Sequence, residues 1–190
     1  MGEDIQRSEA LFVRFAARLS GWSSGRIVAA MLIRPARLDD ASALWSIIGP
    51  TIRAAETYAL DPMLSENDAL AYWLGPDRET FVAEDAGGIV GTYYIRANQG
   101  GGGSHVSNCG YTTHVSATGR GVARRMCEHS IDQARSCGFK AMQFNFVVST
   151  NGRAIRLWQS LGFEVVGRLP LAFRHPSQGY VDALIMFRTL

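Results

Sequence analysis

Hydrophobic positions between residues 31 and 190 follow two periods in turn, and this predicts strands that alternate with helices. The two-residue period and the β-branched or aromatic runs predict strands at 31–37, 80–84, 89–96, 105–115, 141–148, 163–168 and 180–188. The helical period predicts helices from the cap Asp39-Asp40 to Gly49-Pro50 and at 66–74, 119–137 and 151–161. This order, with a hairpin near the middle, predicts an α/β domain with a mixed, twisted central sheet flanked by helices.

The strand at 141–148 shows how the pattern sorts side chains. Its even positions are apolar and are predicted to share one face: Met142, Phe144, Phe146 and Val148. Gln143 and Asn145 are then expected on the other face. Because an unpaired buried amide is costly, Asn145 needs a partner, which is a neighbouring strand, water or a ligand.

Residues 1–30 stand apart from this pattern. Apolar residues at helical spacing predict a short amphipathic helix there, formed around Leu11, Phe12, Phe15 and Leu19. Arg14 and Arg18 interrupt any apolar core of a secretory signal. The segment is either a dispensable extension before the strand that opens at Met31, or a helix that packs on a partner. The predicted organisation is therefore an extension at 1–30 and one domain at 31–190.

Composition narrows the class of protein. Hydrophobic residues make up 47% and charged residues 19%, as in a globular domain. Nineteen basic and 17 acidic residues leave a net charge of +2, which argues against a nucleic-acid-binding protein. No run of eighteen apolar residues predicts a membrane span. Three cysteines do not make a disulfide framework and predict a reducing, cytoplasmic setting.

The stretch Gly110–Ala123, GYTTHVSATGRGVA, carries the first chemical signal. A strand runs into a glycine turn and a helix begins, so free amides and the helix dipole face one point. That geometry suits a pyrophosphate, and Arg120, Arg124 and Arg125 add positive charge. A dinucleotide-binding fingerprint is excluded because it needs a small residue where Arg124 stands.

A second motif follows the strand at 141–148. With the glycine turn, Thr118-Gly119-Arg120-Gly121-Val122-Ala123, it resembles the Gcn5-related N-acetyltransferase superfamily. That superfamily carries a Gly-x-Gly/Ala turn after its fourth strand and an Asn-x-x-Ala-x-x-x-aromatic-x-x-x-Gly-Phe helix after its fifth. The second pattern is matched at Asn151, Ala154, Trp158, Gly162 and Phe163. The resemblance covers roughly residues 31–190.

The resemblance implies that the fourth and fifth strands splay apart and that acetyl-CoA, the co-substrate, sits between them. The residues that would align its pantetheine arm are Thr112, Thr113, His114 and Val115. Those that would hold its pyrophosphate are Gly119, Arg120, Gly121, Val122, Ala123 and Arg124. Asn151 would hydrogen-bond the cofactor arm.

Two positions depart from the superfamily. Thr118 stands where Arg or Gln is usual, which weakens or moves one pyrophosphate contact. Trp158 stands where many members have a tyrosine that protonates the departing thiolate. Because an indole does not serve as an acid, any general acid must be another group or water.

Further motifs resemble the azetidine-2-carboxylate branch of the superfamily, which acetylates proline analogues. They are Asn108-Cys-Gly-Tyr111, Phe144–Asn151, Val166–Pro170 and Tyr180–Ala183. In that branch the matching asparagines contact the substrate, so the resemblance gives Asn108 and Asn145 this role.

Two other groups of residues invite a chemical interpretation. Glu56, in Glu56-Thr57-Tyr58, lies where the superfamily forms its acceptor site. Its carboxylate can bind an amine or accept the amine's proton through water. The alternative is that Glu56 is only an exposed loop residue. His105, His114 and Cys109 lack a fourth ligand, and strand alternation places His114 on the opposite face, so no metal is expected.

The sequence therefore predicts an N-acetyltransferase that moves an acetyl group from acetyl-CoA to the amine of a small molecule, amino- or imino-acid-like. The candidate catalytic residues are Asn145, Asn108 and Glu56. No nucleic-acid or membrane partner is expected, and a homodimer is left open. Two alternatives also stay open: acetylation of a protein or peptide amine, and a non-catalytic acyl-CoA sensor.

Overall fold

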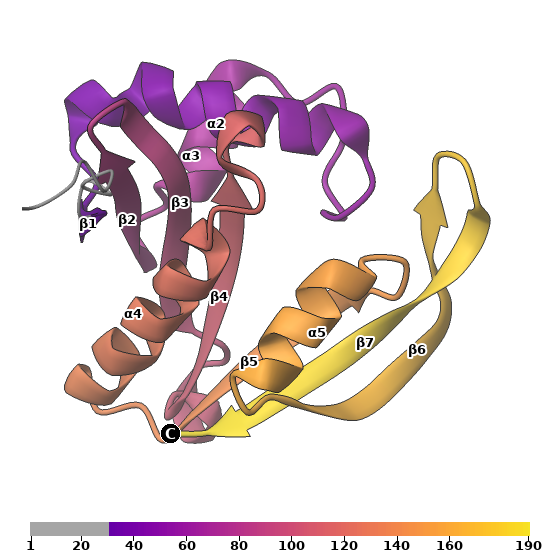
Figure 1. The fold of residues 1–190 in the computed structure, drawn as a ribbon. Helices are drawn as coiled ribbons and strands as arrows, with labels where there is room; N and C mark the ends of the chain where they lie inside the picture. The colour runs from indigo at the N-terminus through magenta and orange to yellow at the C-terminus, as the bar shows by residue number, and fades with distance from the viewer. Residues whose placement is uncertain (1–30) are drawn as a thin grey trace, which may run out of the picture. The chain divides into compact units, whose positions relative to one another are not determined.

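A seven-stranded sheet in the order β1-β2-β3-β4-β5-β7-β6 organises residues 31–190, the part of the chain that the computed structural model describes (Figure 1). Its strands are β1 (Leu32–Pro35), β2 (Arg78–Asp85), β3 (Gly88–Ala97), β4 (Val106–Thr113), β5 (Ala141–Val148), β6 (Glu164–His175) and β7 (Gly179–Thr189). Its helices are α2 (Ala41–Ala54), α3 (Glu66–Trp73), α4 (Val122–Ser136) and α5 (Gly152–Ser160). The mixed α/β fold expected from the sequence is confirmed. The helix expected around Leu11 lies outside the described residues.

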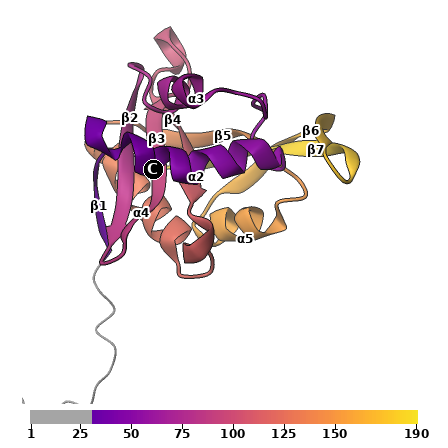
Figure 2. The ribbon, with the colours of Figure 1, turned by 90° about the horizontal axis from the view of Figure 1, so that it is seen from above.

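The sheet parts between β4 and β5. Every other neighbouring pair of strands is antiparallel, whereas β4 and β5 are parallel. The two strands pair at Val106↔Ala141 and Ser107↔Met142, and from Asn108 onward β4 has no partner in β5. Figure 1 shows β4 and β5 close together at their starts and separating along their lengths, and Figure 2 shows the molecule from above, with α2 in front of the sheet. The splay implied by the family resemblance is therefore present.

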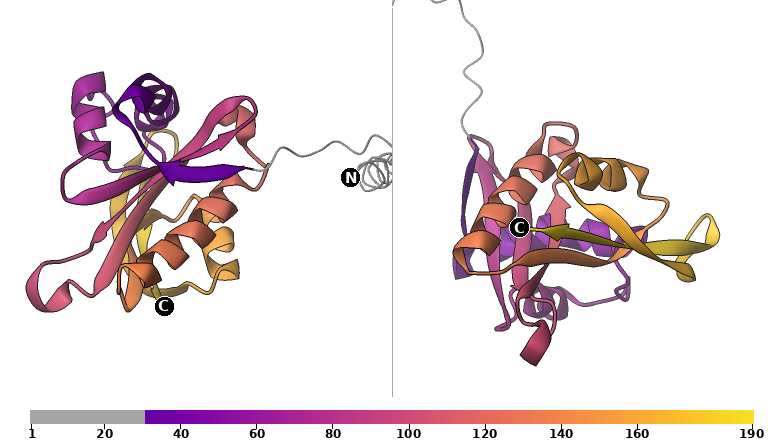
Figure 3. Two further views of the ribbon diagram at one scale, coloured as in Figure 1. Left: turned by 90° about the vertical axis from the view of Figure 1, so that its left-hand side faces the viewer. Right: turned by 90° about the horizontal axis from the view of Figure 1, so that it is seen from below.

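The helices cover both faces of the sheet and make two hydrophobic cores. Figure 3 shows α2 and α3 on one face and α4 and α5 on the other. On the first face, Leu44 and Trp73 pack against Tyr94. On the second, Met126 and Trp158 are among the residues that pack on the sheet. None of the helices within residues 31–190 is long and apolar enough to cross a membrane.

The helix α2 passes through the expected stop at Gly49-Pro50. It continues to Ala54 and ends at Ala55, whose φ of 51° is left-handed. A proline inside a helix costs a backbone hydrogen bond. Ile52 lies beyond the proline and is only 2% exposed, so its burial beside Ile48 favours one further helical turn. Tertiary packing here outweighs the local signal.

A β-bulge in β5 breaks the alternation expected for this strand. Phe144 pairs with Met186 and Val147 with Leu184, so β5 holds one extra residue. Val147, rather than Phe146, therefore joins Phe144 in the core under α4 and α5. Phe146 instead packs edge-on against Phe173 of β6. The prediction that Phe146 shares a face with Phe144 was wrong because sequence alternation cannot show a bulge.

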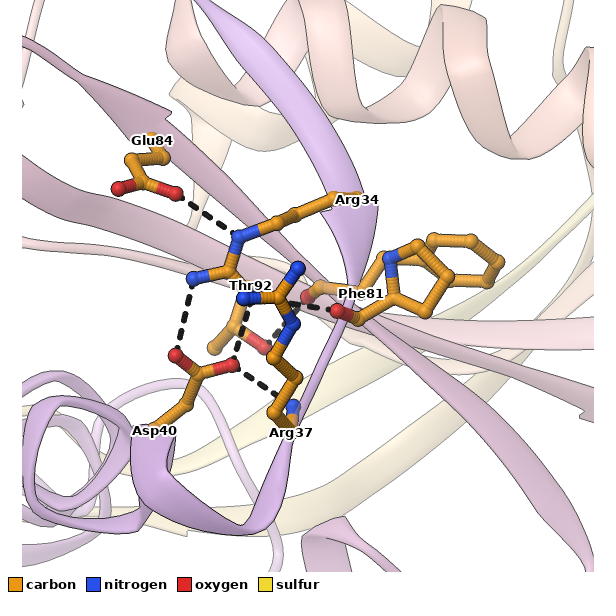
Figure 4. A network of polar contacts seen from close by, with 7 residues as sticks. Arg34, Arg37, Asp40, Phe81, Glu84 and Thr92 are labelled. Carbon is orange, nitrogen blue, oxygen red and sulfur yellow. Dashed lines mark hydrogen bonds and ion pairs between the residues drawn. The ribbon is translucent and has the colours of Figure 1, made fainter.

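A polar network ties β1 to α2 (Figure 4). The Arg34 guanidinium donates to both Asp40 oxygens, at 2.7 and 2.9 Å, and to Glu84 at 2.8 Å. The Arg37 backbone N–H donates to Asp40 at 2.7 Å. The hydrogen bonds from Arg34 hold the pKa of Asp40 below its usual range. Asp40 stands at the N-cap position of α2, as expected, but its side chain makes no capping hydrogen bond to that helix. It caps the preceding 3-10 turn through the Arg37 N–H and anchors the first strand through Arg34.

Candidate active site

A cleft of about 900 Å³ opens where β4 and β5 part. Two groups of residues line it. We call the first the turn half: Thr112 and Thr113 at the end of β4, the residues from Thr118 to Arg124 other than Arg120, and the cleft-lining residues of α5 and its cap. The second, the side-chain half, comes from the loop after α2, from α3 and from β3, β4 and β5. Its polar members include Glu56, Tyr58, Tyr72, Tyr94, Arg96, Asn108 and Asn145.

The glycines of the turn half make an open backbone cradle. Gly119 and Gly121 have φ values of 83° and 80°, a left-handed conformation that suits glycine. A Cβ at Gly121 would meet no heavy atom within 4 Å, so the inner side of the turn is open. The first amides of α4, from Val122 on, have no partner within the helix and carry its positive dipole end. The turn can therefore hold a diphosphate through main-chain donors.

Arginines surround this turn, but not all those expected face the cleft. Arg124 lines it and donates to the Ser160 hydroxyl at 2.8 Å. Arg153, which the motifs did not single out, also lines it, and one guanidinium nitrogen would lie 3.6 Å from a Cβ at Gly119. Arg120 instead pairs with Asp85 and is absent from the lining.

Of the four strand residues expected to align a cofactor, two line the cleft and two do not. Thr112 and Thr113 line the cleft. His114 and Val115 do not: the Nδ1 of His114 accepts the Ser116 N–H at 3.2 Å, and Val115 is 81% exposed. Asn151 lines the cleft, and its Oδ1 accepts the Ala154 N–H at 3.2 Å, so it also caps α5.

The two asparagines of the side-chain half are already hydrogen-bonded. Asn108 Nδ2 donates to the Gln143 backbone oxygen at 2.9 Å and so bridges β4 and β5 just where they part. Asn145 Oδ1 accepts from the Gln143 side chain at 2.8 Å, and its Nδ2 donates to Asn98 at 2.6 Å. The partners left open by the sequence are therefore protein groups. Both amides still border the cleft, together with Glu56.

Tyrosines form much of the wall on this side. Tyr58, two residues after the exposed Glu56, donates its hydroxyl hydrogen to the Tyr111 carbonyl at 2.9 Å. Burial raises the pKa of Tyr58, so its phenol stays protonated at neutral pH. Tyr72 and Tyr94 bring their hydroxyls within 3.4 Å of each other. Sequence reasoning missed these two residues and Arg96, because only the folded chain brings them together. The strand register sets Arg96 opposite Asn108 and Tyr94 opposite Gly110, and Tyr72 reaches Tyr94 from α3.

Trp158 and Cys109 line the cleft without reactive groups. The Trp158 ring lies 5.0 Å from that of Tyr111 and 5.2 Å from that of Phe144, so it belongs to the apolar wall and the core. Burial raises the pKa of Cys109, which keeps it a neutral thiol and a poor nucleophile. Within residues 31–190, no three His, Cys, Asp or Glu side chains gather as metal ligands.

Similarity to known proteins agrees with this geometry. The profile of the Acetyltransferase (GNAT) family matches residues 41–163. The N-acetyltransferase aca1 of Schizosaccharomyces pombe is 30% identical over 161 residues, which cover 76% of this chain and 77% of that protein. A shorter match, 39% identical over 57 residues, covers 30% of this chain and 33% of the L-methionine sulfoximine/L-methionine sulfone acetyltransferase of Salmonella typhimurium.

Solved structures extend the likeness over more of the chain. A GCN5-related N-acetyltransferase from Kribbella flavida is 43% identical, with a TM-score of 0.80, and the match covers 85% of this chain and 98% of that one. The yncA structure from Salmonella typhimurium, which holds its cofactor acetyl-CoA, is 25% identical with a TM-score of 0.74, covering 85% and 94%. The co-substrate is acetyl-CoA, the activity is acyl transfer, and the chain belongs to the acetyltransferase (GNAT) family.

Proposed function

We propose that this enzyme transfers the acetyl group of acetyl-CoA to the primary or secondary amine of a small amino- or imino-acid-like molecule. One observation carries the proposal: a single cleft joins the turn half to the side-chain half through the gap between β4 and β5. The first half offers backbone donors for a diphosphate. The second offers amides, hydroxyls and a carboxylate for a polar acceptor. Residues 31–190 then form the catalytic domain, and 1–30 an extension to it.

In the turn half, the proposed roles follow from which groups are free. The amides of Gly119, Gly121, Val122 and Ala123 bind the diphosphate, whereas the Arg120 amide already donates to the Ala117 carbonyl at 3.2 Å. Arg124 and Arg153 supply positive charge. The backbone of β4 at Thr112 and Thr113 has no partner in β5 and can pair with the pantetheine amides. Asn151 faces this arm. His114, Val115 and Arg120 contribute through the shape of the turn, since their side chains do not line the cleft.

In the side-chain half, Asn108 and Asn145 contact the acceptor. Asn108 Nδ2 donates to the Gln143 carbonyl, so the Oδ1 of Asn108 is the atom that can accept an amine hydrogen. Asn145 is held by Gln143 and Asn98, and its Oδ1 retains a second lone pair. The exposed carboxylate of Glu56 lies at the cleft and can attract a charged amine or receive its proton through water.

Acetyl transfer needs three steps in which groups of the chain or ordered water take part: deprotonation of the amine, stabilisation of the oxyanion and protonation of the departing thiolate. Acetyl-CoA supplies an activated thioester. The amine must lose a proton, which a water ordered by Asn108, Asn145 or Glu56 can take. A free amide of β4 can stabilise the negative charge that develops on the carbonyl oxygen. Trp158 donates no proton, so the departing thiolate takes one from another group or from water.

Two observations support a small amino- or imino-acid-like acceptor. The S. typhimurium enzyme of the shorter match is named for L-methionine sulfoximine and L-methionine sulfone, which are single amino-acid derivatives. The motifs shared with the proline-analogue branch include Asn108 and Asn145, and the fold brings both amides to one cleft.

Location and assembly remain predictions of the sequence. The three cysteines are unpaired, which supports the expected cytoplasmic location. The edge strand β6 exposes Val165, Val166 and Leu169. If the protein forms a homodimer, this apolar edge is the surface that we expect to be buried in it.

The test is release of free coenzyme A thiol from acetyl-CoA with a panel of amino acids, cyclic imino acids, polyamines and peptides. Because Cys137 is exposed, the assay needs an enzyme-only blank or the Cys137→Ser variant. We expect turnover with an amino or imino acid. Turnover with peptides alone would favour protein acetylation instead. Stabilisation by acetyl-CoA without turnover of any amine would favour the sensor.

A further inference from the structure

Unsatisfied polar atoms gather on one face of the sheet beside the cleft. Within residues 31–190, three buried side-chain atoms have no hydrogen-bond partner: Arg78 Nη1, Arg96 Nε and Thr112 Oγ1. Arg96 and Thr112 line the cleft, and Arg78 packs over the rings of Tyr72 and Tyr94, which also line it. Buried donors are usually satisfied, so this concentration points to a group that the protein alone does not provide.

The strand register puts two arginines and an asparagine in one row. Arg78 lies opposite Arg96 across β2 and β3, and Arg96 lies opposite Asn108 across β3 and β4. Residues directly opposite in antiparallel strands point to the same face, with Cβ atoms about 5 Å apart. Arg96 is therefore the immediate neighbour of Asn108, whose free Oδ1 we propose as an amine acceptor.

Charge in this row is not balanced. Asp77 accepts from Arg78 Nε at 2.8 Å and from Arg96 Nη1 at 2.9 Å. The hydrogen bond from Arg78, and then that from Arg96, lower the pKa of Asp77 to about 2, so it is ionised at any working pH. One carboxylate thus serves two guanidiniums. The side chain of Arg96 is 32% exposed and keeps donors free on the cleft side.

We infer that Arg96 binds the carboxylate of the acceptor and so selects α-amino or α-imino acids over simple amines. The inference rests on the proposed function and deepens it. Such an acid carries its carboxylate one carbon from the nitrogen, so neighbouring groups must receive the two. The guanidinium of Arg96 suits a carboxylate, and Asn108 suits the amine. Among the cleft-lining residues of the side-chain half, Arg96 is the cation.

The experiment compares each acid with its own amide. Initial rates are measured for azetidine-2-carboxylate and L-methionine sulfone and for the carboxamide of each. The wild-type enzyme is expected to favour the acids about ten- to hundredfold in kcat/KM, the worth of a charged hydrogen-bonded contact. In Arg96→Gln the preference disappears through a higher KM for the acids, while the KM for acetyl-CoA stays within about twofold. Arg96→Lys keeps the positive charge but loses the paired N–H donors of a guanidinium, so it should keep part of the preference for acids over amides.

Two matched variants separate binding from structure. Asp77→Asn removes the same ion pair but leaves the guanidinium in place, so it should keep the preference for acids. Arg135→Gln removes an exposed arginine of α4 that pairs with Asp132, outside the cleft, and controls for net charge. Acetyl-CoA must still raise the melting temperature of every variant, which shows that each is folded.

The outcomes distinguish the inference from the function on which it rests. Equal use of acids and amides by the wild type would overturn the role of Arg96 and leave small-amine acetylation standing. If Arg96→Gln lowers kcat/KM for acids and amides to the same extent, and Asp77→Asn does the same, then Arg96 has a structural role. Absence of turnover with every small amine would overturn the proposed function itself, and the inference with it.

Discussion

In the turn half of the cleft the proposed diphosphate donors are main-chain amides of one continuous segment, whereas in the side-chain half the proposed binding groups are side chains brought together from several elements. Gly119 to Arg124 span six neighbouring positions. Glu56, Tyr94, Asn108 and Asn145 are spread over ninety. A main-chain site depends on backbone conformation and tolerates many side chains. A side-chain site depends on register and packing and can change its ligand through single substitutions.

The largest expected effect breaks the turn half alone. In Gly121→Val, a β-branched residue must take a left-handed φ, which costs about 1–2 kcal/mol, and its side chain enters the open side of the turn. We expect acetyl-CoA affinity to fall about ten- to hundredfold, the worth of one or two hydrogen bonds to a charged group. Isothermal titration calorimetry with acetyl-CoA measures it.

Gly138→Val is the matched control for this change. Gly138 also has a left-handed φ, 84°, with open space at its Cβ, but it lies at the other end of α4 and outside the cleft. Both variants should lose similar stability, and only the first should lose affinity. Equal affinity in Gly121→Val and the wild type would remove the diphosphate from this turn.

The next effect disturbs the side-chain half through packing. A Cβ at Gly110 would lie 2.6 and 2.8 Å from two ring carbons of Tyr94 and 2.9 Å from its hydroxyl oxygen. Trp73 also contacts the Tyr94 ring edge-on. Gly110→Ala should therefore cost about 1–3 kcal/mol, as overpacking of a core does. The melting temperature would fall and the KM for the acceptor would rise more than that for acetyl-CoA. Gly100→Ala, where no atom lies within 4 Å, should leave stability nearly unchanged; an equal loss there would refute the packing argument.

A smaller effect concerns one amide. Asn145→Ala should lower kcat/KM for the acceptor about three- to tenfold, the worth of one hydrogen bond, and leave the Kd for acetyl-CoA unchanged. Asn98→Ala removes the same internal hydrogen bond from its other end without removing the amide at the cleft. If the two variants lose the same activity, Asn145 has only a structural role.

The smallest effect leaves activity untouched. Cys109 and Cys127 are buried, and burial raises the pKa of Cys127 to about 12 and that of Cys109 still further. Only a thiolate reacts readily, so both should resist iodoacetamide in the folded enzyme at mildly alkaline pH. Intact-mass spectrometry should show one adduct, at the exposed Cys137, and three after unfolding. Early labelling of Cys109 would mean that the cleft opens further than described.

The two halves also differ in how far the sequence predicts them. The glycine turn and the cap Asn151 are local, and the sequence placed both correctly at the start of a helix. Local signals do not predict the structure where tertiary packing determines it. The helix α2 continues past Pro50 because Ile52 is buried. A bulge after Phe144 turns the Phe146 side chain toward Phe173 of β6. Arg96 carried no motif at all. Its place beside Asn108 follows from the pairing of β3 with β4.

The most direct test of this account measures both Michaelis constants in Gly121→Val and Asn145→Ala with one amino- or imino-acid acceptor. The account predicts that each variant changes the constants of its own half: Gly121→Val raises the KM for acetyl-CoA, and Asn145→Ala lowers kcat/KM for the acceptor. Variants that each impair both substrates to the same extent would contradict the division of the cleft into two binding halves.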